Sequence, residues 1–197
     1  MTEREPQGVS DSNSKVIAAS RGEQTPLRSV HTNTFAQILA QFNLSIAVTT
    51  YQAGKLIILR PELRDGQHLV NTHFRNFQKP MGLTWERGRF ALGTNAEIWE
   101  FHDIPTVARK FATSASLSPC DAVFLPRICH MTGDIQVHEM AWVPARLESK
   151  PRSPDLSELW FVNTRFSCLA TRSNVYSFVP RWRPPFALIH FQAPITT

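Results

Sequence analysis

The chain has 197 residues, enough for one ordinary domain, and 42% of them are hydrophobic, so a sizeable core can form. No run of about 18 apolar residues is present to form a transmembrane helix, and the polar N-terminus lacks the apolar segment of a signal peptide. The net charge is +5, but after Trp160 the chain has four Arg and no Asp or Glu. This uneven distribution argues against nucleic acid as a partner. Three cysteines without a C-x-x-C motif favour reduced thiols and a cytoplasmic location.

The N-terminal part of the chain contains one predicted helix. Residues 1–30 are rich in Ser, Gln, Glu, Asn and Arg, so we expect a disordered leader. Residues 34–42 place apolar side chains at positions i, i+3, i+4 and i+7, which predicts a short amphipathic helix with Asn33 as its N-cap. The apolar positions are Phe35, Ile38, Leu39 and Phe42.

Short β-rich segments follow, separated by turn residues. Residues 45–51 and 55–59 are predicted to form a hairpin with Gly54 at its turn, and Asp65-Gly66 is a further turn signal. The segment 144–157 contains several Pro residues and charges, which predicts a long exposed loop. The other predicted strands are 82–85 and 89–93 around a turn at 86–88, the alternating segment 97–101, and the pair 137–143 and 158–163.

A five-residue phrase recurs at 46–50, 90–94 and 160–164, each time as an apolar run that ends in a small or polar residue and Thr. The second and third copies follow related phrases that end in Trp, at 82–85 and 139–142. The first two copies are about 44 residues apart, which is the length of a propeller blade. The pattern predicts an all-β fold, namely an incomplete, β-propeller-like repeat domain with a short N-terminal helix. A β-sandwich or an α+β fold is the alternative.

Several longer phrases carry a resemblance to a known family. They include V-T-T-Y-Q-A-G-K-L (48–56), L-P-R-I-C-H-M-T-G-D-I-Q-V-H-E (125–139), W-F-V-N-T-R-F-S-C-L-A-T (160–171) and S-F-V-P-R-W-R-P-P-F (177–186). Through them the chain, from about Leu44 to Phe186, resembles an uncharacterised bacterial family of conserved hypothetical proteins with a propeller-like fold. The resemblance implies a partial propeller-like domain over 31–186 and implies no activity.

The end of the chain departs from that family. Residues 187–197 resemble none of the further blades that family members contain, so we expect a divergent tail on a truncated or frameshifted chain. An unclosed ring of sheets leaves a strand edge unpaired. We therefore expect marginal stability or poor solubility, and an open edge through which a partner or a second copy completes the sheets.

The segment 129–139 is the first candidate site, because it concentrates imidazole and carboxylate groups. His130, Asp134 and His138 are candidate ligands for a divalent metal such as Zn, Mn or non-haem Fe. In such an enzyme Glu139 would act as base and Arg165 would stabilise charge. The spacing fits no standard metal site, and a polar network that holds a tight turn is the alternative.

A second candidate site carries Arg side chains beside Asn-Thr pairs. Asn163 and Arg165 lie in one such phrase, and Arg75 lies in another, so the three are candidate ligand-binding residues. The alternative is that Asn and Thr satisfy backbone groups at strand ends. Cys168 has apolar neighbours, which favours a buried, inert thiol over a nucleophile.

Two functional hypotheses follow, and the sequence leaves the reaction, if any, unknown. The first is a binding module that holds a small molecule or a protein at the end of a propeller axis. The second is a metal-assisted hydrolase or lyase that uses the His and Asp cluster. No P-loop, G-x-S-x-G, G-x-G-x-x-G or H-E-x-x-H motif is present.

Overall fold

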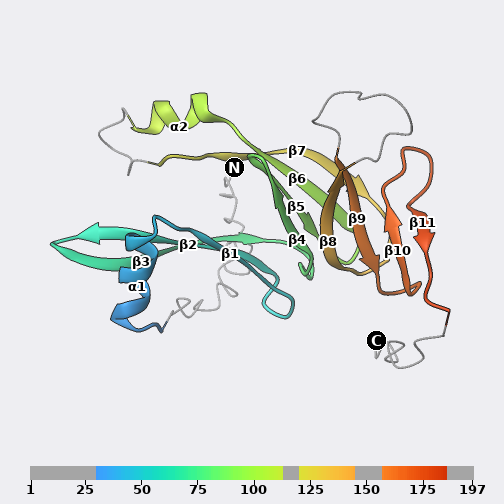
Figure 1. The fold of residues 1–197 in the computed structure, drawn as a ribbon, viewed down its shortest axis with the longest axis horizontal. Coiled ribbons are helices and arrows are strands. Elements are labelled where there is room, and N and C mark those ends of the chain that lie inside the picture. Colours follow the sequence, from blue (N-terminus) through green and yellow to red (C-terminus); the bar gives the residue numbers. More distant parts are fainter. Residues whose placement is uncertain (1–29, 113–119, 145–156, 186–197) are drawn as a thin grey trace, which may run out of the picture. The chain divides into compact units, whose positions relative to one another are not determined.

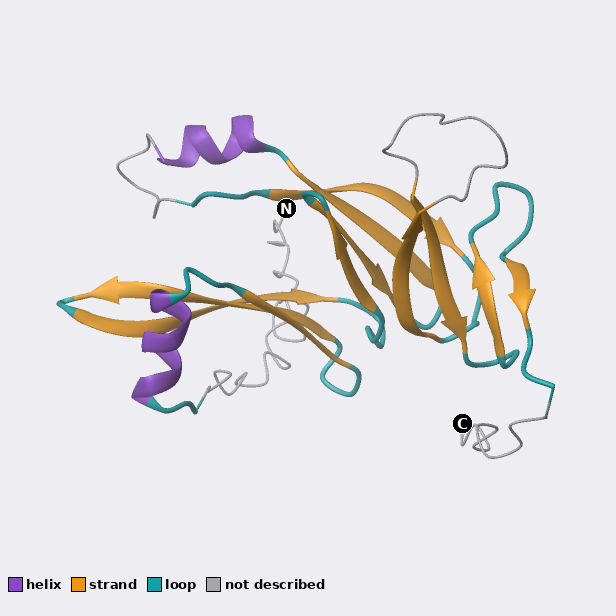
Figure 2. Cartoon of the chain, viewed as in Figure 1, coloured by secondary structure: helices purple, strands orange, loops and turns teal. Residues whose placement is uncertain are grey.

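A computed structural model describes residues 30–112, 120–144 and 157–185. These residues are mostly β, in three small antiparallel sheets with two helices (Figures 1 and 2). All of these elements belong to one compact unit, Asn33–Thr197, which is separate from Met1–Thr32. The predicted leader up to residue 29, most of the predicted 144–157 loop and the tail after Pro185 lie outside the described residues. Within the described ranges no helix has both the length and the apolar character needed to cross a membrane.

Sheet A follows the N-terminal helix. The helix α1 (Asn33–Gln41) confirms the predicted helix and buries Ala36 and Leu39, and it packs on the second and third strands of the sheet. The strands are β1 (Ile46–Thr50), β2 (Lys55–Arg64) and β3 (Gln67–Asn76), in the order β1-β2-β3. Asp65 and Gly66 have φ of 51° and 76°, the left-handed pair of a tight two-residue hairpin turn. β2 therefore extends beyond its predicted end.

Sheet B consists of four strands that pair in chain order. They are β4 (Leu83–Glu86), β5 (Arg89–Gly93), β6 (Glu97–Asp103) and β7 (Phe124–Met131). The turn predicted between the first two is present, with positive φ at Arg87 and Gly88. Helix α2 (Pro105–Ala112) lies between β6 and β7 in the chain, and neither α2 nor β7 was predicted.

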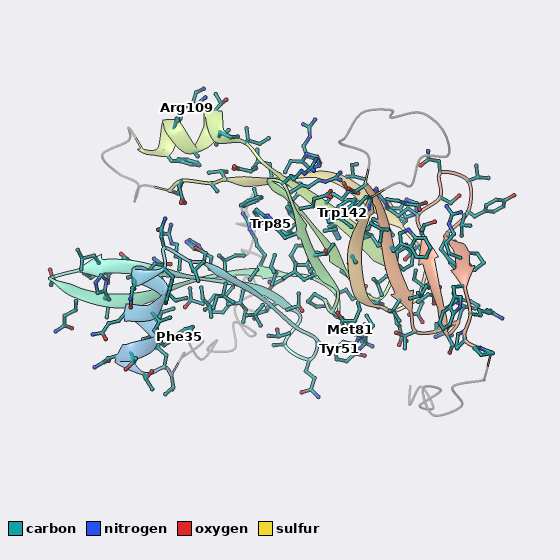
Figure 3. The ribbon with its side chains drawn as sticks, in the orientation of Figure 1. Phe35, Tyr51, Met81, Trp85, Arg109 and Trp142 are labelled. Atoms are coloured by element: carbon teal, nitrogen blue, oxygen red, sulfur yellow. The ribbon has the colours of Figure 1, made fainter. Side chains whose placement is uncertain are left out.

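Sheet C repeats this order. Its strands are β8 (Val137–Pro144), β9 (Ser157–Asn163), β10 (Cys168–Thr171) and β11 (Val179–Trp182), and each pairs with the next. The predicted pair 137–143 and 158–163 is confirmed as β8 and β9. The two upstream phrases that end in Trp occupy the first strands of sheets B and C, where Trp85 and Trp142 lie (Figure 3).

Sheet B packs against a neighbour on each face. On one face, Ala91 and Ile98 join a buried cluster with Leu159, Phe161 and other residues of sheet C. On the other face, Phe90, Leu92 and Phe101 pack with Leu56 of sheet A. Because side chains alternate along a strand, β5 contributes to both clusters.

Two glycines allow β8 to approach sheet B closely. A Cβ atom at Gly93 would lie 2.4 Å from Val137 Cγ1, and one at Gly82 would lie 2.6 Å from Met140 Cγ. Both distances are shorter than carbon atoms tolerate. These close contacts place the start of β8 beside the start of β4.

Each copy of the repeated phrase leads into the turn of a hairpin, in the first strand of sheet A and in the second strand of sheets B and C. The first copy forms β1. The second forms most of β5 together with Thr94, and the third forms the end of β9 together with Thr164. The Thr94 hydroxyl accepts hydrogen bonds from the backbone N–H groups of Ala96 and Glu97, and the Thr50 hydroxyl donates to the carbonyl of Lys55. The hydroxyls of Thr50 and Thr94 therefore hold two of these turns. The open sheets agree with an all-β fold, and the propeller remains a prediction.

Candidate ligand-binding site

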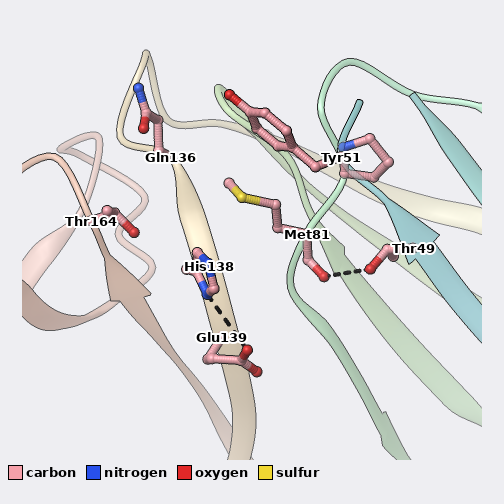
Figure 4. A pocket seen from close by; sticks show the side chains of 8 residues that line it. Thr49, Tyr51, Met81, Gln136, His138, Glu139 and Thr164 are labelled. Atoms are coloured by element: carbon pink, nitrogen blue, oxygen red, sulfur yellow. Dashed lines mark hydrogen bonds and ion pairs between the residues drawn. The ribbon is translucent and has the colours of Figure 1, made fainter. Parts of the chain in front are cut away.

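A hollow of about 450 Å³ lies where segments of the three sheets meet (Figure 4). The end of β1, the segment before β4, the start of β8 and the residue after β9 form its walls. The lining residues are Thr49, Tyr51, Pro80, Met81, Gln136, His138, Glu139 and Thr164.

Hydrogen bonds hold the apolar side of the hollow in place. The Thr49 hydroxyl donates to the backbone carbonyl of Met81 over 2.7 Å and so ties β1 to the segment before β4. The N–H of Met81 donates to the carbonyl of Gly93, which continues the pairing of β4 with β5. Tyr51 is 44% exposed, and the ammonium of Lys79 lies 5.6 Å from the centre of its ring.

Gln136 has a constrained backbone on the polar side. Its φ is 53°, in the left-handed region that non-glycine residues rarely adopt. Its N–H donates to the carbonyl of Asn95 over 2.9 Å, and its own carbonyl accepts from the N–H of Thr164 over 3.3 Å. A turn of sheet B and a turn of sheet C therefore fix this backbone conformation. Residues held in the left-handed region often lie at functional positions.

Three buried polar atoms around Gln136 have no hydrogen-bond partner in the structure. They are Asn95 Oδ1, Asn163 Nδ2 and Thr164 Oγ1. A buried polar atom that lacks a partner costs about 1–3 kcal/mol, so a ligand group that pairs with it gains affinity. Of the three residues, Thr164 is the one that also lines the hollow.

Two of the predicted site residues line the hollow. His138 and Glu139 have side chains that are 56% and 74% exposed, and His138 Nδ1 lies 3.5 Å from Glu139 Oε1. Alternation along a strand predicted that these neighbours face opposite sides. The register of β8 against β9 shifts between Val137 and Met140, and such a bulge lets consecutive side chains reach one side.

The other two candidate metal ligands have different neighbours. Asp134 Oδ2 accepts a hydrogen bond of 2.8 Å from Arg165 Nη1, and His130 Nε2 lies 3.4 Å from the carbonyl of Ser177. In the part of the chain that the structure describes, no group of three or more His, Cys, Asp or Glu residues is arranged to hold a metal ion. The metal site and the catalytic roles of Glu139 and Arg165 therefore stay predictions.

The candidate ligand-binding residues are dispersed. Arg75 is exposed on β3, opposite Leu56, and it is not part of the hollow's lining. Asn163 is fully buried, and its Oδ1 accepts from the N–H of Phe166 over 3.1 Å, as expected for a side chain that satisfies a strand end. Cys168 lies in the core, where burial raises the pKa of its thiol, as expected for an inert cysteine.

Sequence reasoning missed the apolar wall of the hollow. Tyr51 and Met81 come from short phrases, V-T-T-Y-Q and P-M-G-L, that carry no charge pattern. Thr164 could be found only as the last residue of the recurring phrase, and that phrase predicted a repeat fold rather than a binding site. Residues far apart in the chain form this wall, so local spacing could not reveal it.

A second hollow, of about 380 Å³, lies at the turn between β4 and β5 and includes Glu86, Arg89 and His102. Its charges are already paired, since Glu86 accepts from Arg89 over 2.6 Å and from the Ser157 hydroxyl over 2.5 Å. The guanidinium of Arg89 also lies 3.8 Å from the centre of the Trp142 ring. These contacts join sheets B and C, and His102 Nε2 in the same lining is buried without a hydrogen-bond partner.

The fold and the hollow define a class, a mostly β domain with a hollow at the junction of its three sheets. Residues 33–192 match the family described as Domain of unknown function (DUF4915), and the chain belongs to this family. The match extends past Phe186 into the segment that was expected to be divergent. Neither a curated protein nor a solved structure matches the chain.

Proposed function

We propose that the chain is a propeller-type binding module whose ligand site is the hollow at Tyr51, Met81, His138 and Thr164. Two features support the propeller. Sheets B and C each consist of four antiparallel strands that pair in chain order, as propeller blades do. They also pack face to face through a continuous core. The starts of β4 and β8 then lie near the axis, where propellers commonly bind ligands.

The lining favours a neutral ligand that carries hydroxyl groups and is about the size of a monosaccharide. Tyr51 and Met81 offer apolar surface against which the face of a sugar ring can pack. Gln136, His138 and Glu139 offer hydrogen-bond donors and acceptors on the opposite side. The volume is within the range of about 300–1,000 Å³ that small-molecule sites occupy.

The unpaired hydroxyl of Thr164 is the observation that carries this proposal. It is buried, lacks a partner and belongs to a residue that lines the hollow. This oxygen has almost no accessible surface in the free protein, so a ligand must first displace part of the lining, and a sugar hydroxyl can then donate to it or accept from it. Binding would then remove the cost of an unsatisfied polar atom, which gives affinity as well as orientation.

Saturation-transfer NMR on the full chain tests the proposal, with glucose, galactose, mannose and N-acetylglucosamine as probes. We expect transfer to at least one sugar, and a loss of about tenfold in affinity for Thr164→Val and for Tyr51→Ala. Thr72→Val, on β3 and outside the hollow's lining, is the matched control and should bind as the unmodified chain does. Absence of transfer to all four sugars, or transfer that neither variant weakens, would contradict the proposal.

A further inference from the structure

One face of sheet A carries a basic cluster that the hollow does not use. The strands β2 and β3 form a long hairpin (Figure 1), in which Leu56 pairs with Arg75 and Ile58 pairs with His73. Residues directly opposite each other in an antiparallel pair lie on the same face of the sheet. Alternate residues of a strand also share a face, so Arg60 lies on the face that carries Leu56 and Ile58. The basic cluster therefore consists of Arg60, His73 and Arg75.

The three side chains are close together and open to solvent. His73 is two residues from Arg75 along β3 and is a diagonal neighbour of Arg60, a relation that separates residues by about 7–8 Å. His73 and Arg75 are exposed, and Arg60 is half-buried. Burial, and then the charges of Arg60 and Arg75, lower the pKa of His73 from its ordinary value of 6.5. Both guanidinium groups therefore act on the imidazole.

The carboxylate that also acts on His73, that of Glu62, is already engaged. Its Oε2 accepts a hydrogen bond of 2.7 Å from Asn71, and its Oε1 accepts one of 3.1 Å from Arg64. Within the described ranges of the chain, no ion pair joins Arg60 or Arg75 to a carboxylate. Like charges that are neighbours on one face of a sheet destabilise it, and a bound anion removes this repulsion.

Two guanidinium groups beside an imidazole match a phosphate group better than a carboxylate. Each guanidinium presents a planar fork of N–H donors that fits two oxygen atoms. A carboxylate has oxygens for one such fork, whereas a phosphate monoester has three free oxygens and a charge of about −1.5 to −2 at pH 7. The imidazole can donate to an oxygen that the forks leave over.

We propose that Arg60, His73 and Arg75 form a binding site for a phosphate group, which is either inorganic phosphate or the monoester of a small molecule. The two Arg side chains hold the group from different strands, and His73 lies one step along the face from each. None of the three residues lines the hollow, so this site is independent of the proposed sugar site. It also gives a role to Arg75, which the sequence singled out.

Titration calorimetry on the full chain in phosphate-free buffer tests the proposal, with inorganic phosphate, glycerol 3-phosphate and acetate as probes. We expect a phosphate probe to bind one to one and at least about tenfold more tightly than acetate. Arg75→Gln and Arg60→Gln should each weaken this binding about tenfold or more. Arg127→Gln removes the same charge from an exposed position on β7 and is the matched control. No binding at millimolar phosphate, acetate binding of equal strength, or equal weakening by the control would overturn the proposal.

The two phosphate probes distinguish the sources of the group. A lower Kd for glycerol 3-phosphate than for inorganic phosphate supports a small ester as the ligand. The reverse order supports free phosphate, and each order supports the site.

Thermal unfolding separates ligand binding from a structural role of the Arg side chains. Without phosphate, Arg75→Gln should leave Tm unchanged or raise it, because the substitution removes repulsion between like charges. A ligand that binds only the native state raises Tm, so phosphate should raise the Tm of the unmodified chain more than that of Arg75→Gln. A lower Tm for Arg75→Gln without phosphate, together with no gain for the unmodified chain in phosphate, would overturn the proposal.

Discussion

The strands β1 and β5 consist of the same recurring phrase and have opposite surroundings. Ala91 and Leu92 of β5 are fully buried, whereas Ala47 and Val48 of β1 are exposed. β5 pairs with a strand on each side and packs against a sheet on each face. Among the described residues, β1 pairs with one strand and packs toward sheet B on one face only. Local sequence thus specifies a strand and its turn, and the neighbours decide how much stability the strand contributes.

The largest expected effect is the loss of the ion pair between sheets B and C. Glu100 on β6 is 1% exposed, and its carboxylate accepts a hydrogen bond from Arg172. Arg172→Met would remove the arginine partner and leave the buried carboxylate with only His102 Nε2, 3.8 Å away, so we expect the free energy of unfolding to fall by about 3–5 kcal/mol in urea titrations.

Arg181→Met is the matched control for that substitution. Arg181 pairs with Glu158 over 2.7 Å, but both side chains are about 40% exposed. Its loss should cost at most about 1 kcal/mol, because water screens the pair. Equal losses of unfolding free energy for the two variants would show that water screens the Glu100 pair as it screens the exposed one.

Truncation of matched positions in β5 and β1 compares their surroundings directly. Leu92→Ala removes a side chain that is fully buried between sheets A and B, so we expect a loss of about 2–5 kcal/mol. Val48→Ala, at the corresponding position of β1, should cost less than about 1 kcal/mol, because Val48 is 37% exposed. Similar losses in chemical denaturation would remove the distinction between the strands.

The close contact at Gly93 gives an intermediate effect. Gly93→Ala places a methyl group against Val137, so we expect a loss of about 1–3 kcal/mol by thermal or urea unfolding. The double variant with Val137→Ala should recover part of that loss, because the two side chains compete for one space. Additive losses would contradict a direct contact.

The smallest effect depends on pH. Hydrogen bonds from Arg89 and then Ser157 hold the pKa of Glu86 below its ordinary value of 4.5. A carboxyl group whose pKa falls on folding stabilises the native state above the pKa of the unfolded chain, and this contribution is lost as pH falls through the folded pKa. Glu86→Gln should therefore cost at most about 1 kcal/mol at pH 7. Unfolding titrations from pH 7 to below 4.5 should show the difference shrink, and a constant difference would contradict this linkage.

The elements that the sequence predicted are those with strong local signals. The helix at Phe35 to Phe42 has a clear period, and Gly54, Gly66 and Gly88 mark the turns of three hairpins. β7 was missed because it is an exposed edge strand that contains Pro126 and has no alternating pattern. β10 and β11 are only four residues each and owe their existence to pairing in sheet C.

The candidate site was predictable in part. The segment around His138 was correctly singled out, but the prediction assumed one extended strand from Ile135 to Glu139. β8 begins at Val137 because Gln136 adopts a left-handed conformation, and Asp134 therefore pairs with Arg165. Nothing in local spacing could indicate that Tyr51 and Met81 lie opposite His138, since tertiary packing creates that proximity.

Residue-resolved amide exchange on the full chain tests the central claim most directly, namely that β1 and β5 are one repeated element in open and closed surroundings. The account predicts that the amides of Ala91 and Leu92 exchange at least about a hundredfold more slowly than those of Ala47 and Val48, because exchange follows the cost of local opening. Equal protection in the two strands would contradict the claim, since β1 would then not be an open edge.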